Sequence, residues 1–272
     1  PASPNAIAEH VVKQLAIEPG DVDALRQVQW QRLVELYPQL EARTEWAQPQ
    51  LYLPVLNQHM PVHPVDAPHA GIGLDIDYLI GGCRDEANLF AALLDLPGSQ
   101  FDRRARQVTA AAGADWAAVL ARYNQVRPEL DAEECFTAAV GDMWFRVPSL
   151  RIAEGHQRHS KRATYVYQFD WSSPFLGAAH ALDLMVFGNG LPFSWLAGLK
   201  DYDKTANFMR KAWVAFAHSG NPEALGQPWP TYKRQQATLS INESTSLLAQ
   251  SYRQQFPMLE PAIQSNWQAA GL

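Results

Sequence analysis

The stretch Tyr165-Val-Tyr-Gln-Phe-Asp170 predicts a β-strand, because its aromatic and β-branched residues favour a pleated, half-buried surface. A second stretch, Gly177-Ala-Ala-His-Ala-Leu-Asp-Leu-Met-Val-Phe-Gly188, follows it and begins with small residues that leave room around His180. A histidine on a loop just past a strand is well placed to act as a general base in an open α/β sheet. The alternative is a single histidine with a structural role.

The bulk composition is that of an ordinary globular protein. The chain has 272 residues, 47% of them hydrophobic and 18% charged, which fits one large domain or two small ones. Its net charge is −6 and its pI is about 5.7, and the sequence holds no stripe of lysine and arginine that could bind phosphates. A short basic cluster around Lys161 is typical of the solvated end of a helix. These features argue against a nucleic-acid partner.

Two cysteines, Cys83 and Cys135, are too few for a disulfide framework, although they could form one pair. No run of about 18 apolar residues occurs, so we expect no membrane-spanning segment. No signal peptide is visible at Pro1, and the sequence has no initiating methionine. We therefore expect a processed or truncated piece of a longer protein.

Helices dominate the predicted secondary structure. Apolar spacing predicts them at residues 4–15, 21–37, 87–94, 131–141, 142–159, 204–219 and 252–272, with two more between residues 100 and 127. Strands are expected at residues 77–83, 165–170 and 237–242, an extended segment at 51–56, and a connector at 38–49. Strands alternate with helices, but three strands are few for a free-standing parallel sheet. We therefore expect part of an α/β domain rather than all of one.

Two titratable residues, Glu86 and His180, each follow a predicted strand and a group of small residues. A carboxylate that holds an imidazole in one tautomer is the orienting half of a nucleophile–histidine–acid triad. The order of acid before histidine fits the α/β-hydrolases, in which the serine precedes both. Alternatively, Glu86 is a carboxylate in the first turn of a helix, where the helix dipole favours a negative charge.

The nucleophile of such a triad is missing from the sequence, since no Gly-x-Ser-x-Gly motif occurs in it. Cys83 lies close to Glu86 along the chain and could serve as a thiol nucleophile. A small buried thiol at the end of a strand is the simpler interpretation of this cysteine.

A metal site is a further alternative. Its ligands would be His59, Asp66 and the two histidines His63 and His69. Their spacing matches no tight ligand pair, and they lie on a segment rich in proline. Gly71-Ile-Gly73 neither follows a strand nor opens a helix, so the sequence indicates no dinucleotide cofactor.

Five stretches of sequence, which occur in order and span most of the chain from Leu51 onward, share one resemblance. They are Ile80-Gly-Gly-Cys-Arg-Asp-Glu-Ala-Asn-Leu-Phe90, Asp142-Met-Trp-Phe-Arg-Val-Pro148, Tyr165 to Asp170 with Gly177-Ala-Ala-His180, Ala181-Leu-Asp-Leu-Met-Val-Phe-Gly188, and Trp213-Val-Ala-Phe-Ala-His-Ser-Gly-Asn-Pro222 with Trp229-Pro-Thr-Tyr232. Together they resemble the C-terminal half of the type B carboxylesterases, the family of the cholinesterases and of bacterial para-nitrobenzyl esterases. One departure is Pro54-Val-Leu-Asn-Gln58, which stands where the family has Pro-Val-x-Asp-Gly.

The resemblance implies an α/β-hydrolase fold, of which residues 1–272 form the C-terminal part of a single domain with a helical insert at about 86–160. It implies that Glu86 is the triad acid and His180 the triad histidine of a serine esterase. The serine and the oxyanion hole would lie in an N-terminal half, on the same polypeptide or on a second chain. This chain alone would then be inactive, and no cofactor or metal is implied.

Three residues, Leu89, Phe90 and Leu182, match family positions that line the substrate gorge. Leu89 stands where cholinesterases often carry an aromatic residue, so the resemblance implies a neutral aliphatic or aryl ester rather than a choline ester. It also implies a soluble enzyme of bacterial type, cytoplasmic or secreted. The alternative function is a non-catalytic binding or adhesion domain of the same fold, although such a relative need not keep Glu86 and His180.

Overall fold

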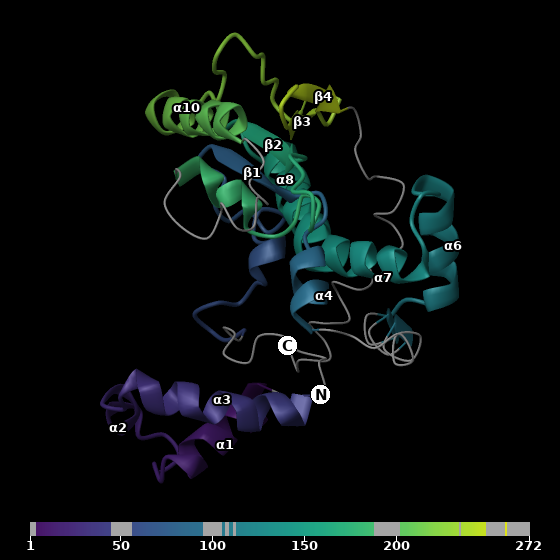
Figure 1. Cartoon of the computed structure of the whole chain (residues 1–272). Helices are drawn as coiled ribbons and strands as arrows, with labels where there is room; N and C mark the ends of the chain where they lie inside the picture. The colour runs from purple at the N-terminus through teal and green to yellow at the C-terminus, as the bar shows by residue number, and fades with distance from the viewer. Residues whose placement is uncertain are drawn as a thin grey trace.

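A computed structural model describes the chain over residues 4–44, 56–94, 105–106, 109–110, 113–187, 202–233 and 235–248, and at Leu259. Within these residues a four-stranded sheet is packed between helices (Figure 1). Several predicted segments lie outside the described residues. They are residues 51–55, most of 100–112, and 252–272 apart from Leu259.

The sheet has the strand order β1-β2-β3-β4. Strand β1 (Tyr78–Cys83) pairs in parallel with β2 (Thr164–Phe169), which in turn pairs in parallel with β3 (Thr238–Ile241). All three predicted strands are therefore confirmed. Because parallel strands end at the same edge of a sheet, the loops that follow β1 and β2 come out side by side there.

A fourth strand, β4 (Ser246–Leu248), pairs antiparallel with β3 and was not predicted. Its three residues are too few to show an alternating pattern in the sequence. The turn before it is stabilised by Asn242, whose side-chain oxygen accepts a hydrogen bond of 2.7 Å from the backbone N–H of Ser244. With β2 on one side and β4 on the other, β3 is an inner strand of the sheet.

Successive residues of β2 face opposite sides of the sheet and contact different helices. Val166 packs against α8 (Val147–His159) on one side. Tyr165 and Phe169 face the other side, in a core shared with α10 (Asp203–Ser219). The sheet thus lies between two helical layers, and the loops at its carboxyl edge remain open for a site.

The burial of β1 and β2 differs from the expected pattern. β2 was predicted to be half-buried, but five of its six residues are buried because helices cover both faces. β1 was predicted to be buried, yet among its residues only Cys83 is fully buried. In the described part of the chain β1 pairs with one strand only, which leaves its outer edge less covered.

A helical region joins β1 to β2. It consists of α4 (Asn88–Leu94), α6 (Trp116–Val126), α7 (Ala132–Gly141), a π-helical segment η2 (Asp142–Arg146), and α8. Its own core includes Trp116, Tyr123 and Phe136. The helix predicted over residues 142–159 is confirmed, except that its first turn is the wider π form.

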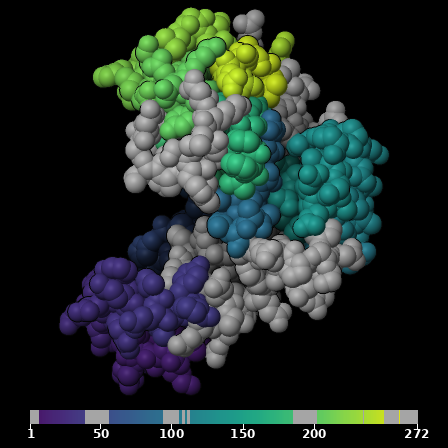
Figure 2. Space-filling view, viewed as in Figure 1, coloured from purple at the N-terminus to yellow at the C-terminus, as the bar shows by residue number. Residues whose placement is uncertain are grey.

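The N-terminal helices are α1 (Pro4–Gln14), α2 (Val22–Arg26) and α3 (Trp30–Thr44), which form the lobe at the bottom of Figure 2. They enclose a small core of their own around Ile7 and Val11.

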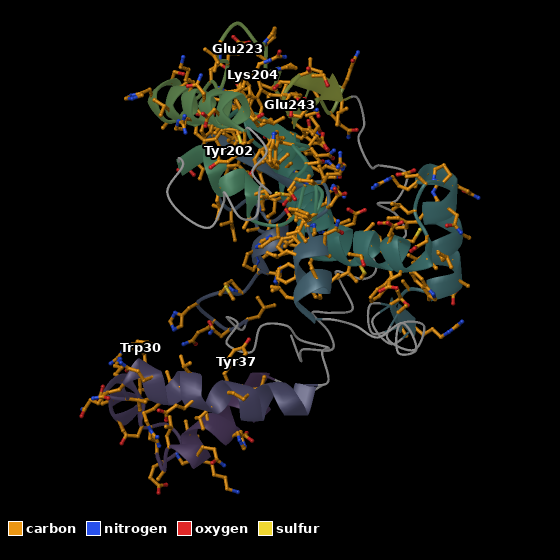
Figure 3. All side chains as sticks on the ribbon, in the orientation of Figure 1. Trp30, Tyr37, Tyr202, Lys204, Glu223 and Glu243 are labelled. Carbon is orange, nitrogen blue, oxygen red and sulfur yellow. The ribbon has the colours of Figure 1, made fainter. Side chains whose placement is uncertain are left out.

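The sequence predicted one helix at residues 21–37 and a connector at 38–49, and both predictions were wrong. A backbone hydrogen bond from the N–H of Gln27 to the carbonyl of Ala24 closes α2, and Trp30, which is 67% exposed, starts a new helix (Figure 3). α3 then continues through Pro38, which removes one backbone donor without ending it.

The two cysteines are free and buried. The optional pairing of Cys83 with Cys135 is therefore not formed. Along the described parts of the chain, every helix is too short or too polar to reach across a lipid bilayer.

A buried histidine makes the stability of the fold depend on pH. His156 of α8 has no exposed surface, stacks on Tyr78 with ring centroids 3.9 Å apart, and has its Nδ1 atom 2.7 Å from Thr164 Oγ1. Burial lowers the pKa of this imidazole. In the unfolded chain the same side chain takes up a proton near pH 6.5, whereas the folded protein binds it only at lower pH.

We therefore expect the free energy of unfolding in urea to fall as the pH is lowered from about 7 to about 5. The variant His156→Gln should be less stable at pH 7 but should lose less stability over this range. His218→Gln, which changes an exposed histidine at the end of α10, should keep the pH dependence of the unchanged chain. Equal pH dependence in all three proteins would contradict the assignment to His156.

Candidate active site

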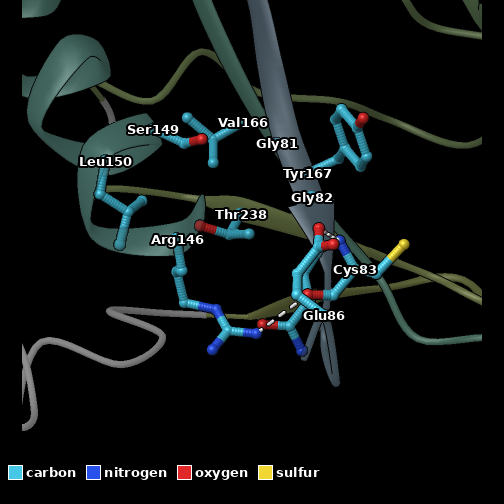
Figure 4. A pocket seen from close by; sticks show the side chains of 11 residues that line it. Gly81, Gly82, Cys83, Glu86, Arg146, Ser149, Leu150, Val166, Tyr167 and Thr238 are labelled. Atoms are coloured by element: carbon cyan, nitrogen blue, oxygen red, sulfur yellow. Dashed lines mark hydrogen bonds between the residues drawn. The ribbon is translucent and has the colours of Figure 1, made fainter. Parts of the chain in front are cut away.

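Glu86 lies in the turn that follows β1, and its carboxylate is held from the strand itself. The side chain is 5% exposed, and its Oε1 atom accepts a hydrogen bond of 2.6 Å from the backbone N–H of Cys83 (Figure 4). A Cβ atom on Gly82 would lie 2.7 Å from this Oε1 atom, so only glycine leaves room for the carboxylate. Gly82, at the end of the predicted strand, therefore makes room for the Glu86 carboxylate.

The loop that carries His180 is tied to the turn that carries Glu86. Asp85 exchanges two hydrogen bonds with Ala178, since its backbone N–H donates to the carbonyl and its Oδ2 atom accepts from the N–H. Asn88 Nδ2 donates to the carbonyl of Leu176. Gly177, at φ +66°, permits the close approach, because a Cβ there would lie 2.6 Å from Asp85 Oδ2.

The structure brings Glu86 and His180 together, although they are 94 residues apart in the sequence. Glu86 Oε2 lies 2.6 Å from His180 Nδ1, and the backbone N–H of His180 donates to the carbonyl of Glu86 at 3.4 Å. Because the carboxylate can only accept, this contact places the imidazole proton on Nδ1 and leaves the lone pair on Nε2. The hydrogen bond to Glu86 raises the pKa of His180, and burial partly offsets it.

Two aromatic rings border the imidazole of His180. The ring centroids of Phe90 and Phe145 lie 5.2 and 4.8 Å from that of His180, and these two phenylalanine rings are nearly parallel. Phe90 comes from α4 and was predicted as a substrate contact, whereas Phe145 comes from η2 and was missed. The sequence signal for Phe145 was its place in the family-like stretch Asp142-Met-Trp-Phe-Arg-Val-Pro148.

The other two residues predicted to contact substrate, Leu182 and Leu89, pack against the main core. Leu182, at the start of the short helix η3 (Leu182–Phe187), is 1% exposed and belongs to the main core, so it offers no surface to a ligand. Leu89 is partly buried against the same core.

Three further polar side chains, Asp183, Tyr167 and Cys83, are close to the Glu86–His180 pair. Asp183 accepts a hydrogen bond of 3.1 Å from Tyr167 Oη, and burial raises the pKa of both side chains. Burial also raises the pKa of the Cys83 thiol well above its ordinary value, with the charges of Asp183 and Glu86 adding to the effect. A thiol held in its protonated form is a poor nucleophile, so the alternative of Cys83 as the reactive group is not supported.

The residues of the alternative metal site do not converge. His63 Nδ1 accepts from the N–H of Val65, His69 Nε2 lies 3.2 Å from the carbonyl of Arg151, and Asp66 pairs with Arg151. Across the parts of the chain that the structure describes, no three His, Cys, Asp or Glu side chains gather in a way that could hold a metal ion.

A depression of about 370 Å³, which includes space open to solvent, is bordered by Glu86 (Figure 4). Its lining includes Gly82, Arg146, Ser149 and Tyr167.

Comparison with solved structures identifies the architecture as the α/β-hydrolase fold, as predicted. The chain matches a thermophilic PNB esterase with a TM-score of 0.72 and 21% identity, over 94% of this chain and 54% of that one. A carboxylesterase of Geobacillus stearothermophilus gives a TM-score of 0.68 and 24% identity, with the same coverage. The chain therefore has the α/β-hydrolase fold, and it spans about half the length of these two structures.

The chain belongs to the carboxylesterase family, whose sequence profile matches residues 3–258. It is 30% identical to the phenmedipham hydrolase of Pseudarthrobacter oxydans over 230 residues, which are 78% of this chain and 45% of that protein. It is 28% identical to the para-nitrobenzyl esterase of Bacillus subtilis (strain 168), over 85% of this chain and 47% of the esterase. The chain thus spans less than half the length of these curated relatives. Both are named as enzymes, so they lend no support to a non-catalytic binding or adhesion domain.

Proposed function

We propose that the protein to which this chain belongs is a serine carboxylic-ester hydrolase, in which His180 is the general base and Glu86 is the acid that orients it. The observation that carries the proposal is the contact of 2.6 Å between Glu86 Oε2 and His180 Nδ1 at the carboxyl edge of the sheet. Membership of the carboxylesterase family supports the same function.

The geometry of the pair suits the two proton transfers of ester hydrolysis. Nε2 of His180 takes the proton of a serine hydroxyl as the hydroxyl oxygen attacks the ester carbonyl. The imidazolium is then stabilised by the negative charge of Glu86, and it returns the proton to the departing alkoxide. Water attacks the acyl-enzyme in the second half of the reaction, with His180 again as the base.

We further propose that the serine and the oxyanion hole come from a segment equivalent to the first half of the relatives, on the same polypeptide or on a second chain. The proposal rests on the absence of a Gly-x-Ser-x-Gly motif from this sequence and on its coverage of less than half of those relatives. On this view residues 1–272 form the C-terminal part of one α/β-hydrolase domain, and residues 86–160 form its helical insert.

The substrate that suits the site is a neutral ester with an apolar acyl or alcohol group. Phe90 and Phe145 offer aromatic surface beside the reactive imidazole, which suits aliphatic and aryl groups. One relative is named for a para-nitrobenzyl ester, whose alcohol group carries an aromatic ring, and this agrees with the proposed substrate class.

The test of the proposed function is hydrolysis of a para-nitrophenyl ester by two proteins. We expect the purified 272-residue chain to release no nitrophenol above the buffer rate, because it lacks the serine. The longer polypeptide that includes the preceding segment should hydrolyse the ester and should be inhibited by a reagent that modifies active serines.

Turnover by the 272-residue chain alone would contradict the missing-nucleophile argument. A longer polypeptide that binds the ester but does not hydrolyse it would overturn the esterase assignment.

A further inference from the structure

Two consecutive residues of the π-helical segment η2 contact His180 and the turn that carries Glu86. Phe145 lies against the imidazole of His180, with ring centroids 4.8 Å apart. The next residue, Arg146, extends to the turn that carries Glu86. The wider turn is evident from the backbone N–H of Val147, which donates to the carbonyl of Asp142 five residues earlier. Such π segments often occur at functional sites.

The guanidinium of Arg146 holds the backbone just before Glu86. Its Nη2 atom donates to the carbonyl of Cys83 at 3.2 Å and to the carbonyl of Arg84 at 2.7 Å (Figure 4 shows the first). The N–H of the same Cys83 donates to Glu86 Oε1. Arg146 and the Glu86 carboxylate therefore bind Cys83 at its carbonyl and its N–H, and movement of this residue would move the carboxylate.

Arg146 is itself held by buried partners. Its Nη1 atom forms an ion pair with Asp142, which is 3% exposed. Asp142 Oδ2 accepts a hydrogen bond of 2.5 Å from the Oη atom of Tyr123, which is 2% exposed. A buried charge is retained at a cost in desolvation, and a fully bonded network of this kind fixes one geometry.

The helix before η2 comes unusually close to the acid turn. Gly141 is the last residue of α7, and a Cβ atom there would lie 3.1 Å from the backbone nitrogen of Ala87 and 3.4 Å from the Cβ of Glu86. Because Gly141 has no side chain, the start of η2 lies directly against Glu86 and Ala87.

We propose that Arg146 is a positioning residue for the catalytic acid, held by Asp142 and Tyr123, and that η2 aligns Glu86 with His180. The proposal deepens the proposed esterase function and rests on it for the catalytic role, but the alignment can be measured without any turnover. Three independent features carry it, namely the two bonds from Arg146, its buried counter-charge, and the close approach at Gly141.

The test is the pKa of His180, measured by NMR titration of the chain with ¹⁵N-labelled histidine and assigned with a His180→Gln variant. The charges that act on this imidazole come from Glu86 in the acid turn and Asp183 in η3, while α4 and η2 present the rings of Phe90 and Phe145. In Arg146→Met we expect the pKa of His180 to fall by about 1 pH unit or more, because the bond to Glu86 weakens. Loss of a nearby positive charge alone would raise that pKa, so the sign separates the two effects.

Arg151→Met is the matched control. Arg151 lies on α8, is 17% exposed against 12% for Arg146, and pairs with Asp66 at 2.5 Å away from the acid turn. It should lower the melting temperature without changing the pKa of His180. Arg146→Lys keeps the charge but loses the planar guanidinium that reaches the two carbonyls through Nη2 and Asp142 through Nη1. The pKa of His180 should therefore fall less than in Arg146→Met. If Arg146→Met does not fold, Arg146→Lys tests the proposal in its place.

In the longer polypeptide, Arg146→Met should lower kcat by about 10²-fold with little change in KM, and Arg151→Met should leave both nearly unchanged. An unchanged or raised pKa of His180 in both Arg146 variants would overturn the proposal. If the pKa falls but the unchanged longer protein hydrolyses no ester, the positioning role stands and the proposed function fails.

Discussion

Replacing His180 with glutamine in the complete enzyme should lower kcat for a para-nitrophenyl ester by about 10³–10⁴-fold or more. Glutamine keeps a polar side chain at this position, but it cannot take a proton from a hydroxyl or return one to the departing alkoxide. KM should change much less than kcat, because the imidazole acts on the reacting atoms and contributes little to ground-state binding. The measurement is the steady-state rate of nitrophenol release near neutral pH.

His159→Gln is the control for this experiment. His159 lies at the exposed end of α8, where its ring is 6.2 Å from that of His69, and its loss removes an imidazole outside the site. We expect this variant to retain the full rate. A His180→Gln enzyme with a kcat within about tenfold of the unchanged enzyme would remove His180 from the mechanism.

Replacing Glu86 with glutamine should produce the second largest loss, again about 10³–10⁴-fold in kcat, together with a change in the pH profile. The hydrogen bond that His180 donates to the charged carboxylate raises the pKa of His180. Because the base works only when neutral, activity of the unchanged enzyme declines as the pH falls through this raised value. Glutamine removes the charge, so the acidic limb of kcat/KM should move to lower pH while the plateau drops.

Glu86→Asp is the matched comparison, since it keeps the carboxylate on a side chain that is one methylene shorter. The shorter side chain cannot reach both the N–H of Cys83 and Nδ1 of His180, so we expect an intermediate loss of kcat. The acidic limb should stay closer to that of the unchanged enzyme. An acidic limb that does not move in Glu86→Gln would show that Glu86 does not set the pKa of the base.

Most of the elements that build the site could be predicted from local sequence. The strands that precede Glu86 and His180 were found because runs of apolar and aromatic residues between small residues indicate strands. Helix α7 was found from its apolar spacing, and Asp131 indeed caps its first turn. The failures occurred where local signals conflict with packing, as in α3, which continues through Pro38, or where the element is very short, as in β4.

The residues around the pair were harder to predict than the pair itself. Phe145 and Arg146 read as ordinary members of a helical stretch, because nothing in their spacing shows that the helix begins with a π turn. Leu182 was predicted as a substrate contact, but its burial depends on how η3 folds back onto the main core. Such contacts join residues far apart in the sequence, so local patterns carry little information about them.

By itself the sequence determined the three parallel strands and most of the helices, the family, and which carboxylate and imidazole are candidates for catalysis. Those properties follow from short-range periodicity, from capping residues and from motifs that can be read in one dimension. Only the tertiary structure decided that Glu86 and His180 meet at 2.6 Å and that Arg146 holds the acid turn. These distances depend on the parallel register of β1 with β2 and on how closely η2 packs against the turn after β1, and both are set by the whole folded chain.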